Sequence, residues 1–117
     1  MAAKPKRTSP ETMAYILDQL GAAGDVRARK MFGEYGVYCG DRFIGVVCAD
    51  QLFIKPTPAG AALEPDLGRA PPYEGAKPSV VISPDMLEDP DRLAAFVRAT
   101  ADALPPQKPR RKKKAVS

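Results

Sequence analysis

The sequence predicts an α+β fold in which helices pack on an antiparallel sheet. Residues 26–55 are dense in aromatic and β-branched residues, with two-residue polar breaks between the runs, which is typical of a four-strand meander. Apolar residues at helical spacing stand near both ends of the chain, each run following a residue that caps helices. Residues 79–82 add one later strand, so the expected order of elements is α-β-β-β-β-α-β-α.

The first helix is expected to begin directly after Ser9. Ser9 suits the N-cap, Pro10 suits the first helical position, and Glu11 lies near the positive end of the helix dipole. The apolar residues that follow recur at i, i+3, i+4 and i+7: Met13, Ile16, Leu17 and Leu20. Gly21 and Gly24 then end the helix and lead into the first strand.

The meander is expected to turn at Gly40-Asp41 and at Asp50-Gln51. Because Gly40 accepts a positive φ without steric cost, a tight turn there would place Cys39 opposite Arg42. Alternation along the central strand would put one set of residues on one face and a second set on the other: Phe43, Gly45 and Val47, against Ile44, Val46 and Cys48. Both faces are apolar, so we expect helices or a partner chain to cover each of them at least partly.

Two further elements are expected after the meander. Thr57 can cap a short helix over residues 58–63, because the prolines on either side of it break the sheet ladder. Residues 64–78 are rich in Pro and Gly and form a loop with Tyr73 in its middle. A short strand over residues 79–82 follows this loop.

Two further pairs of a capping residue and a proline, Ser83-Pro84 and Asp89-Pro90, predict the start of the last helix. Its apolar residues form one stripe: Leu93, Phe96, Val97, Thr100 and Leu104. From the strand and helix patterns together, we expect Phe43, Val47 and Phe96 to be buried.

Charge divides the chain into a folded part and two ends. The sequence holds 18 basic and 14 acidic residues. All 14 acidic residues and nine of the basic ones fall within residues 8–104, which gives that part a net charge of −5 against +9 for the ends. We therefore expect one α+β domain at 8–104, a disordered basic arm at 1–7 and a disordered basic tail at 105–117.

Enzymatic chemistry finds little support in the sequence. Histidine, the commonest general base and metal ligand, is absent, and no Ser, Cys or Lys stands beside a base. The one local carboxylate cluster lies at helix starts, where capping explains it better than a metal or catalytic pair: Asp85, Glu88, Asp89 and Asp91. We expect no enzyme activity, no cofactor and no metal.

The two cysteines and the absence of a long apolar run suggest the compartment. In the expected hairpin, Cys39 and Cys48 lie on the order of 20 Å apart at strand rise, which is too far for a disulfide. We expect reduced, buried thiols. Because the sequence has no run of membrane-spanning length and no signal peptide, a cytoplasmic protein with no membrane contact is expected.

Basic residues gather in two places. Arg27, Arg29 and Lys30 are interpreted as a solvated sheet edge, with a small anion-binding patch as the alternative. The tail holds six basic residues within seven positions: Lys108, Arg110, Arg111, Lys112, Lys113 and Lys114. This tail can neutralise phosphates but carries no aromatic residue to stack on bases, so non-specific nucleic-acid contact and simple solubilisation both stay open.

Four motifs stand in a fixed order along the sheet block: Arg29-Lys30-Met31-Phe32-Gly33, Tyr35-Gly36-Val37-Tyr38, Phe43 within an apolar strand, and Leu52-Phe53-Ile54-Lys55. In this order the chain resembles the N-terminal domain of the TfoX/Sxy competence-regulator family, from about Thr12 to about Leu104. The full-length regulators carry a C-terminal domain as well, for which 117 residues leave no room. The resemblance therefore implies a bacterial protein that consists of the N-terminal domain alone.

The resemblance implies a non-enzymatic regulatory or protein-interaction domain, similar to the part of the regulators that acts with other transcription proteins. The expected partner is a transcription factor or a second copy of this chain. Exposed aromatic residues are the expected contacts, with packing in the core or a loop as their equal alternative: Tyr35, Tyr38 and Tyr73. The rival function is a non-specific nucleic-acid-binding accessory protein that acts through its basic tails.

Overall fold

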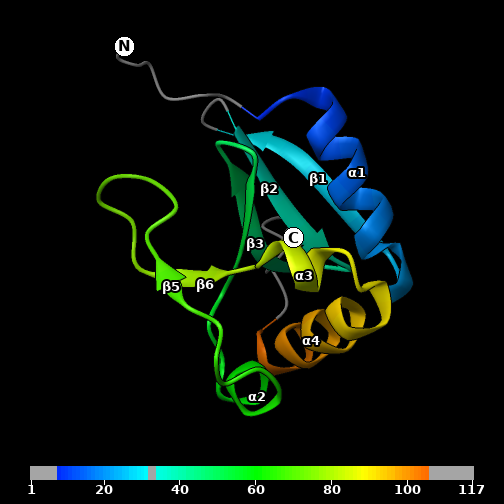
Figure 1. Ribbon diagram of the computed structural model, residues 1–117, viewed down its shortest axis with the longest axis vertical. Coiled ribbons are helices and arrows are strands. Elements are labelled where there is room, and N and C mark those ends of the chain that lie inside the picture. The colour runs from blue at the N-terminus through cyan, green and yellow to red at the C-terminus, as the bar shows by residue number, and fades with distance from the viewer. Residues whose placement is uncertain (1–7, 32–33, 106–117) are drawn as a thin grey trace, which may run out of the picture.

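The structure of the chain is a computed structural model that describes residues 8–31 and 34–105. At its centre lies a six-stranded sheet with the strand order β1-β2-β3-β4-β6-β5, in which every pair is antiparallel. The helices α1 and α4 lie on one side of this sheet, and the segment around β5 projects away from them (Figure 1). The predicted α+β class with an antiparallel sheet is confirmed.

The first four strands form the predicted meander: β1 (Val26–Met31), β2 (Glu34–Cys39), β3 (Arg42–Cys48) and β4 (Gln51–Ile54). At the turn between β2 and β3, Cys39 pairs with Arg42 and Gly40 has a φ of 62°, as the sequence predicts. The later strand β6 (Ser79–Val81) pairs with β4.

The predicted helix caps are present. The helices are α1 (Pro10–Leu20), α2 (Pro58–Leu63), α3 (Pro84–Leu87) and α4 (Pro90–Ala103). Their N-cap residues are Ser9, Thr57, Ser83 and Asp89. In each case the side-chain oxygen accepts a hydrogen bond from the backbone N–H three residues further on, and a proline follows at the start of the helix. Local side-chain chemistry therefore sets where each helix begins.

Three short elements were absent from the expected order: the 3₁₀ turn η1 (Gly21–Ala23), the strand β5 (Arg69–Ala70) and the separate helix α3. Gly24 ends η1 with a φ of 117°, a conformation that favours glycine. β5 lies within the segment expected to be a loop. It forms a strand there because it pairs with β6, and the Val81 N–H donates to the carbonyl of Gly68 at 2.9 Å. α3 is separate from α4 because Pro90 supplies no N–H to continue a helix.

The hydrophobic core fills the space between the sheet and the helices. Its most buried side chains include residues of α1, β3 and α4: Ile16, Leu20, Ile44, Val47, Leu93 and Phe96. The predicted burial of Val47 and Phe96 is therefore confirmed. α2 approaches α4 closely at Gly60, where an added Cβ would lie 2.9 Å from Cε1 of Phe96.

The predicted alternation along β3 is wrong, because β3 contains a β-bulge. Val37 pairs with Gly45 while Tyr38 pairs with Phe43, so Ile44 is the extra residue. Ile44 and Val47 therefore both lie in the core, whereas Phe43 lies on the opposite face and is only half-buried. The expected burial of Phe43 is corrected accordingly.

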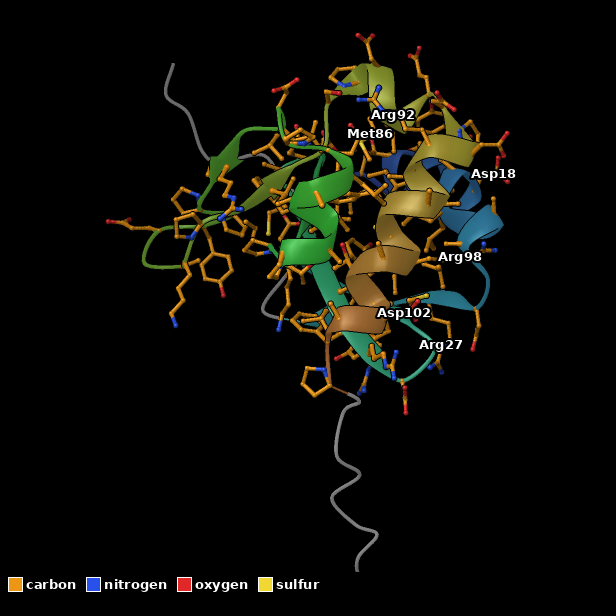
Figure 2. The ribbon with its side chains drawn as sticks, turned by 90° about the horizontal axis from the view of Figure 1, so that it is seen from below. Asp18, Arg27, Met86, Arg92, Arg98 and Asp102 are labelled. Carbon is orange, nitrogen blue, oxygen red and sulfur yellow. The ribbon has the colours of Figure 1, made fainter. Side chains whose placement is uncertain are left out.

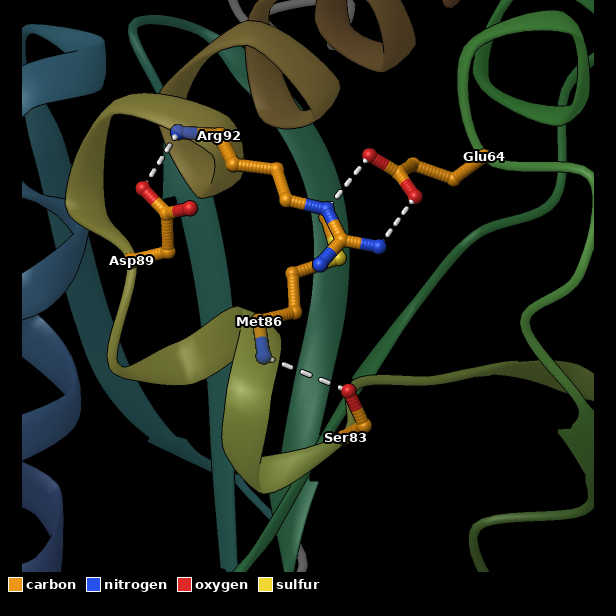
Figure 3. Close-up of polar contacts among 5 residues, drawn as sticks. All are labelled: Glu64, Ser83, Met86, Asp89 and Arg92. Carbon is orange, nitrogen blue, oxygen red and sulfur yellow. Dashed lines mark hydrogen bonds and ion pairs between the residues drawn. The ribbon is translucent and has the colours of Figure 1, made fainter.

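Two polar clusters fasten the helices to the rest of the fold. Arg92 of α4 donates from Nε and Nη2 to the two oxygens of Glu64, at 2.8 and 2.6 Å (Figure 3). These bonds lower the pKa of Glu64. At the other end of the domain, Glu34 accepts from the backbone N–H groups of Thr8, at 3.2 Å, and Ala49, at 3.1 Å. Glu34 thus attaches the start of α1 to the turn between β3 and β4.

The far end of α4 is held in a similar way. Arg98 donates to the carbonyl oxygens of Ala23 and Ala22 in η1, at 3.3 and 3.1 Å. One turn later Asp102 lies 3.7 Å from the guanidinium of Arg42, which begins β3. Figure 2 shows Arg98 and Asp102 following one another along α4. Within the described ranges, no helix has the length and the apolar character needed to cross a membrane.

Candidate functional site

A cavity lies on the face of the sheet opposite α1 and α4. It has a volume of about 790 Å³. Its floor is formed by side chains of β2, β3 and β4 or directly after them: Tyr38, Phe43, Val46, Cys48 and Lys55. The segment between β5 and β6 contributes a wall: Pro72, Tyr73, Ala76 and Lys77. We call this cavity the sheet-face pocket.

Backbone geometry explains why this floor faces away from the core. Val47 points into the core, so its neighbours Val46 and Cys48 point to the other face. The bulge at Ile44 then returns Phe43 to the same face as Val46, next to its cross-strand partner Tyr38. The two rings lie 5.2 Å apart between centroids at a tilt of 49°, which is a favourable arrangement for an aromatic pair.

Two lysines bring positive charge to this apolar floor. The ammonium nitrogen of Lys55 lies 4.9 Å from the centre of the Phe43 ring, within reach of a cation–π interaction. Lys77 is exposed on the wall opposite the sheet. Among the described residues that line the pocket, the one carboxylate belongs to Glu34, whose oxygens already accept the N–H groups of Thr8 and Ala49.

The structure brings the three predicted contact tyrosines to one site, in different roles. Tyr38 and Tyr73 line the pocket, and Tyr73 is 57% exposed. Tyr35 also lines the pocket, but it pairs with Val47 and packs against the core, with Lys30 Nζ 6.0 Å from the centre of its ring. For Tyr35 the packing interpretation therefore accounts for much of the side chain.

Phe43 and Lys55 are site residues that the sequence analysis did not select. Phe43 was assigned to the core and Lys55 to the end of a strand. The available signal was the apolar character of both faces of β3, which indicated that something other than water covers the second face. Among the described residues, helices cover one face only, and the second face is left to the pocket and its loop wall.

The basic residues of β1 lie at a sheet edge, as predicted. β1 is the first strand in the sheet order and pairs with β2 alone among the described strands. Val26 and Ala28 pack against the core, so Arg27 and Arg29 lie on the same face as the pocket. Arg27 donates to the carbonyl oxygen of Gly40 at 2.7 Å, while Arg29 is exposed.

The structure describes some of the other residues that the sequence analysis considered, namely the cysteines and the carboxylates. Cys39 and Cys48 are both free, and burial raises the pKa of each thiol. Within residues 8–31 and 34–105, no three Cys, Asp or Glu side chains are grouped as a metal site would require. Asp89 acts as the cap of α4, as predicted. The basic arm at 1–7 and the six basic residues of the tail lie outside the described residues.

Comparison with known proteins gives two matches. The family described as TfoX N-terminal domain matches residues 18–104. A protein of Spirochaeta aurantia, described as an uncharacterized 12.7 kDa protein in the trpE 5′ region, is 37% identical over 108 residues. That alignment covers 91% of either chain. The family match includes every strand of the sheet and each residue named above as part of the pocket.

Proposed function

The chain belongs to the TfoX N-terminal domain family, and on that premise we propose that it is a non-enzymatic regulatory domain that binds another protein. The observation that carries this proposal is the sheet-face pocket. It sets aromatic and aliphatic side chains on a face that the helices leave uncovered, with Tyr73 more than half exposed above it. Tyr and Phe are enriched in protein interfaces because one ring buries a large area at little entropic cost.

The chemistry around the pocket supports binding over catalysis. Of its titratable groups, Glu34 is held by backbone N–H groups and the Cys48 thiol has a raised pKa, so neither is an activated base or nucleophile. The chain contains no histidine to complete such a pair. The partner we propose is a transcription factor or a second copy of this chain.

Affinity capture from cells in which the chain naturally occurs tests this proposal. We expect the full chain and a form without residues 107–117 to recover the same protein, because the pocket lies within the described domain. Tyr73→Ser should abolish or strongly weaken recovery. Tyr15→Ser is the matched control, since Tyr15 is 44% exposed on α1 and does not line the pocket. Recovery that depends on the tail, or that is equal for both variants, would contradict the proposal.

Non-specific nucleic-acid binding through the basic tail is the second candidate function. The observation that favours it is the run of six basic residues within positions 108–114. Contact of all six with duplex phosphates would give a log–log salt slope of up to about −5, without a preference for base sequence. We expect removal of residues 107–117 to abolish such binding. Retained binding with a sequence preference would contradict this candidate and place the contact in the domain.

A further inference from the structure

We propose that the sheet-face pocket binds an acidic, aromatic segment of the partner protein, in which a large apolar side chain stands next to Asp or Glu. This inference rests on the proposed function and names the chemistry that the partner must present. Three features of the pocket carry it: its size, the position of its two lysines, and the distribution of charge over the domain.

The size of the pocket fits a short segment of chain. Its volume of about 790 Å³ lies within the range of roughly 300–1,000 Å³ that is usual for sites that hold a molecule of several linked groups. One side chain would fill only a part of it. An extended segment places alternate side chains on one side, so two of them can rest on the floor formed by Tyr38, Phe43 and Val46.

The lysines require the occupant to carry negative charge beside its apolar group. Lys55 holds its ammonium over the ring of Phe43, so a side chain lying on Phe43 has this cation directly next to it. Lys77 brings a second cation from the opposite wall. Among the described residues, no ion pair is formed by either lysine. A carboxylate on the occupant would pair with them in surroundings that are largely apolar.

The pocket face holds basic residues on a domain whose net charge is negative. Residues 8–105 hold nine basic and 14 acidic residues, a net charge of −5. Four of the nine basic residues nevertheless lie on the pocket side of the sheet: Arg27, Arg29, Lys55 and Lys77. Of the acidic residues near this face, Glu34 lines the pocket with its oxygens bound to backbone N–H groups, and Asp25 lies 3.9 Å from Arg27. Glu74 of the loop does not line the pocket, so Lys55 and Lys77 keep no carboxylate partner among the described residues. An acidic segment is therefore attracted to this face, while the rest of the surface disfavours it.

A single-stranded nucleic acid is the main rival occupant, because bases stack on tyrosine rings and phosphates attract lysine. The net charge of −5 argues against it, since a strand longer than the pocket carries its further phosphates over an acidic surface. A peptide segment with two or three carboxylates has no such continuation. The two occupants are separated in the experiment below.

Fluorescence anisotropy with the full chain tests the inference. The probe is a fluorescein-labelled peptide with two phenylalanines between three glutamates, flanked by glycine and serine. We expect saturable binding that weakens as salt is added. A matched peptide with glutamine in place of glutamate should bind at least about fivefold more weakly, and a peptide with serine in place of phenylalanine should not saturate.

Two lysine variants and one control locate the contact. Lys77→Met and Lys55→Met keep the length of the side chain and remove its charge, and each should weaken the acidic peptide about two- to fivefold. Arg69→Met removes an exposed charge from β5, at a position that pairs with the buried Val80, and should leave binding unchanged. Equal loss in Arg69→Met and Lys77→Met would show a general charge effect and overturn the inference.

The outcomes separate this inference from the proposed function. If the chain captures a partner protein but Lys55→Met and Lys77→Met do not lower capture, the function stands and the acidic segment is rejected. If a labelled twelve-residue oligothymidylate binds the form without residues 107–117 and Lys77→Met weakens it, the occupant is nucleic acid. If the glutamine peptide binds as well as the glutamate peptide, the pocket is apolar only and the inference is wrong.

Discussion

Replacing Gly45 by alanine tests the close approach of β3 and β4 beneath the pocket. A Cβ on Gly45 would overlap the carbonyl oxygen of Phe53 and lie 3.0 Å from Cα of Ile54. Both obstacles are backbone atoms of β4, which no side-chain rotation can move away. The two strands would have to separate where Gly45 pairs with Ile54.

The expected cost follows from what that separation breaks. Overpacking alone costs about 1–3 kcal/mol. Separation also strains nearby backbone hydrogen bonds such as that from Lys55 N to the Ile44 carbonyl, which is 2.8 Å long, at about 1 kcal/mol each. We expect Gly45→Ala to lower the free energy of unfolding by about 3 kcal/mol or more, a large fraction of the stability of a domain this size.

Urea unfolding followed by circular dichroism measures this effect. At the usual dependence on denaturant, a loss of about 3 kcal/mol lowers the midpoint by more than about 1 M. Gly68→Ala is the matched control, because a Cβ there meets nothing within 4 Å, and its effect should stay within about 1 kcal/mol. If both alanine variants unfolded at the same midpoint, the strands would not lie as close as described and the reasoning would be refuted.

Three further predictions concern the core, the α2–α4 ion pair and the pocket thiol. Phe96→Ala should lower the free energy of unfolding in urea by about 3–5 kcal/mol, since Phe96 is 1% exposed. Phe43→Ala should lower it clearly less, because the Phe43 ring is half-buried. Equal losses would contradict the assignment of the two rings to different faces. The bonds from Arg92 lower the pKa of Glu64, so the pair stabilises the folded chain above about pH 4.3 and this contribution is lost as pH falls through the folded pKa. The melting-temperature difference between the native chain and Glu64→Gln should therefore shrink from about pH 7 to about pH 3, and a constant difference would count against the ion pair. Cys48 lines the pocket with a raised pKa and is 8% exposed, so iodoacetamide should modify it slowly, and more slowly still with the acidic peptide bound; protection of Cys39 instead would place the peptide elsewhere.

The parts of the fold that could be predicted are those that short-range chemistry determines. Ser9 and Thr57 cap helices because their own side chains reach the N–H three residues on, which any reader of the sequence can foresee. The turn at Gly40 is equally local. The order of the meander follows because each strand pairs with its neighbour along the chain.

The features that escaped prediction depend on residues far apart in the sequence. The bulge at Ile44 is a shift in the pairing register between β2 and β3. The sequence of either strand alone does not reveal it. This bulge places Phe43 on the face away from the core. The expected burial of Phe43 was therefore wrong. The pocket also needs the wall around Tyr73, whose place over the sheet is fixed by the pairing of β6 with β4. The three tyrosines selected from the sequence all line this pocket, whereas the residues that each ring contacts could not be foreseen.

The edge position of β1 has a consequence for the chain while it folds. Hairpins between neighbouring strands form quickly, whereas α4 must return from the far end of the chain to cover the sheet. Until it does, an uncovered sheet with a free outer strand is a template on which another molecule can add its own strand and aggregate. Arg27, Arg29 and Lys30 make two such edges repel each other, and the opposite edge, β5, spans only two residues. We therefore expect the charges at this edge to disfavour aggregation of the half-folded chain before α4 covers the sheet.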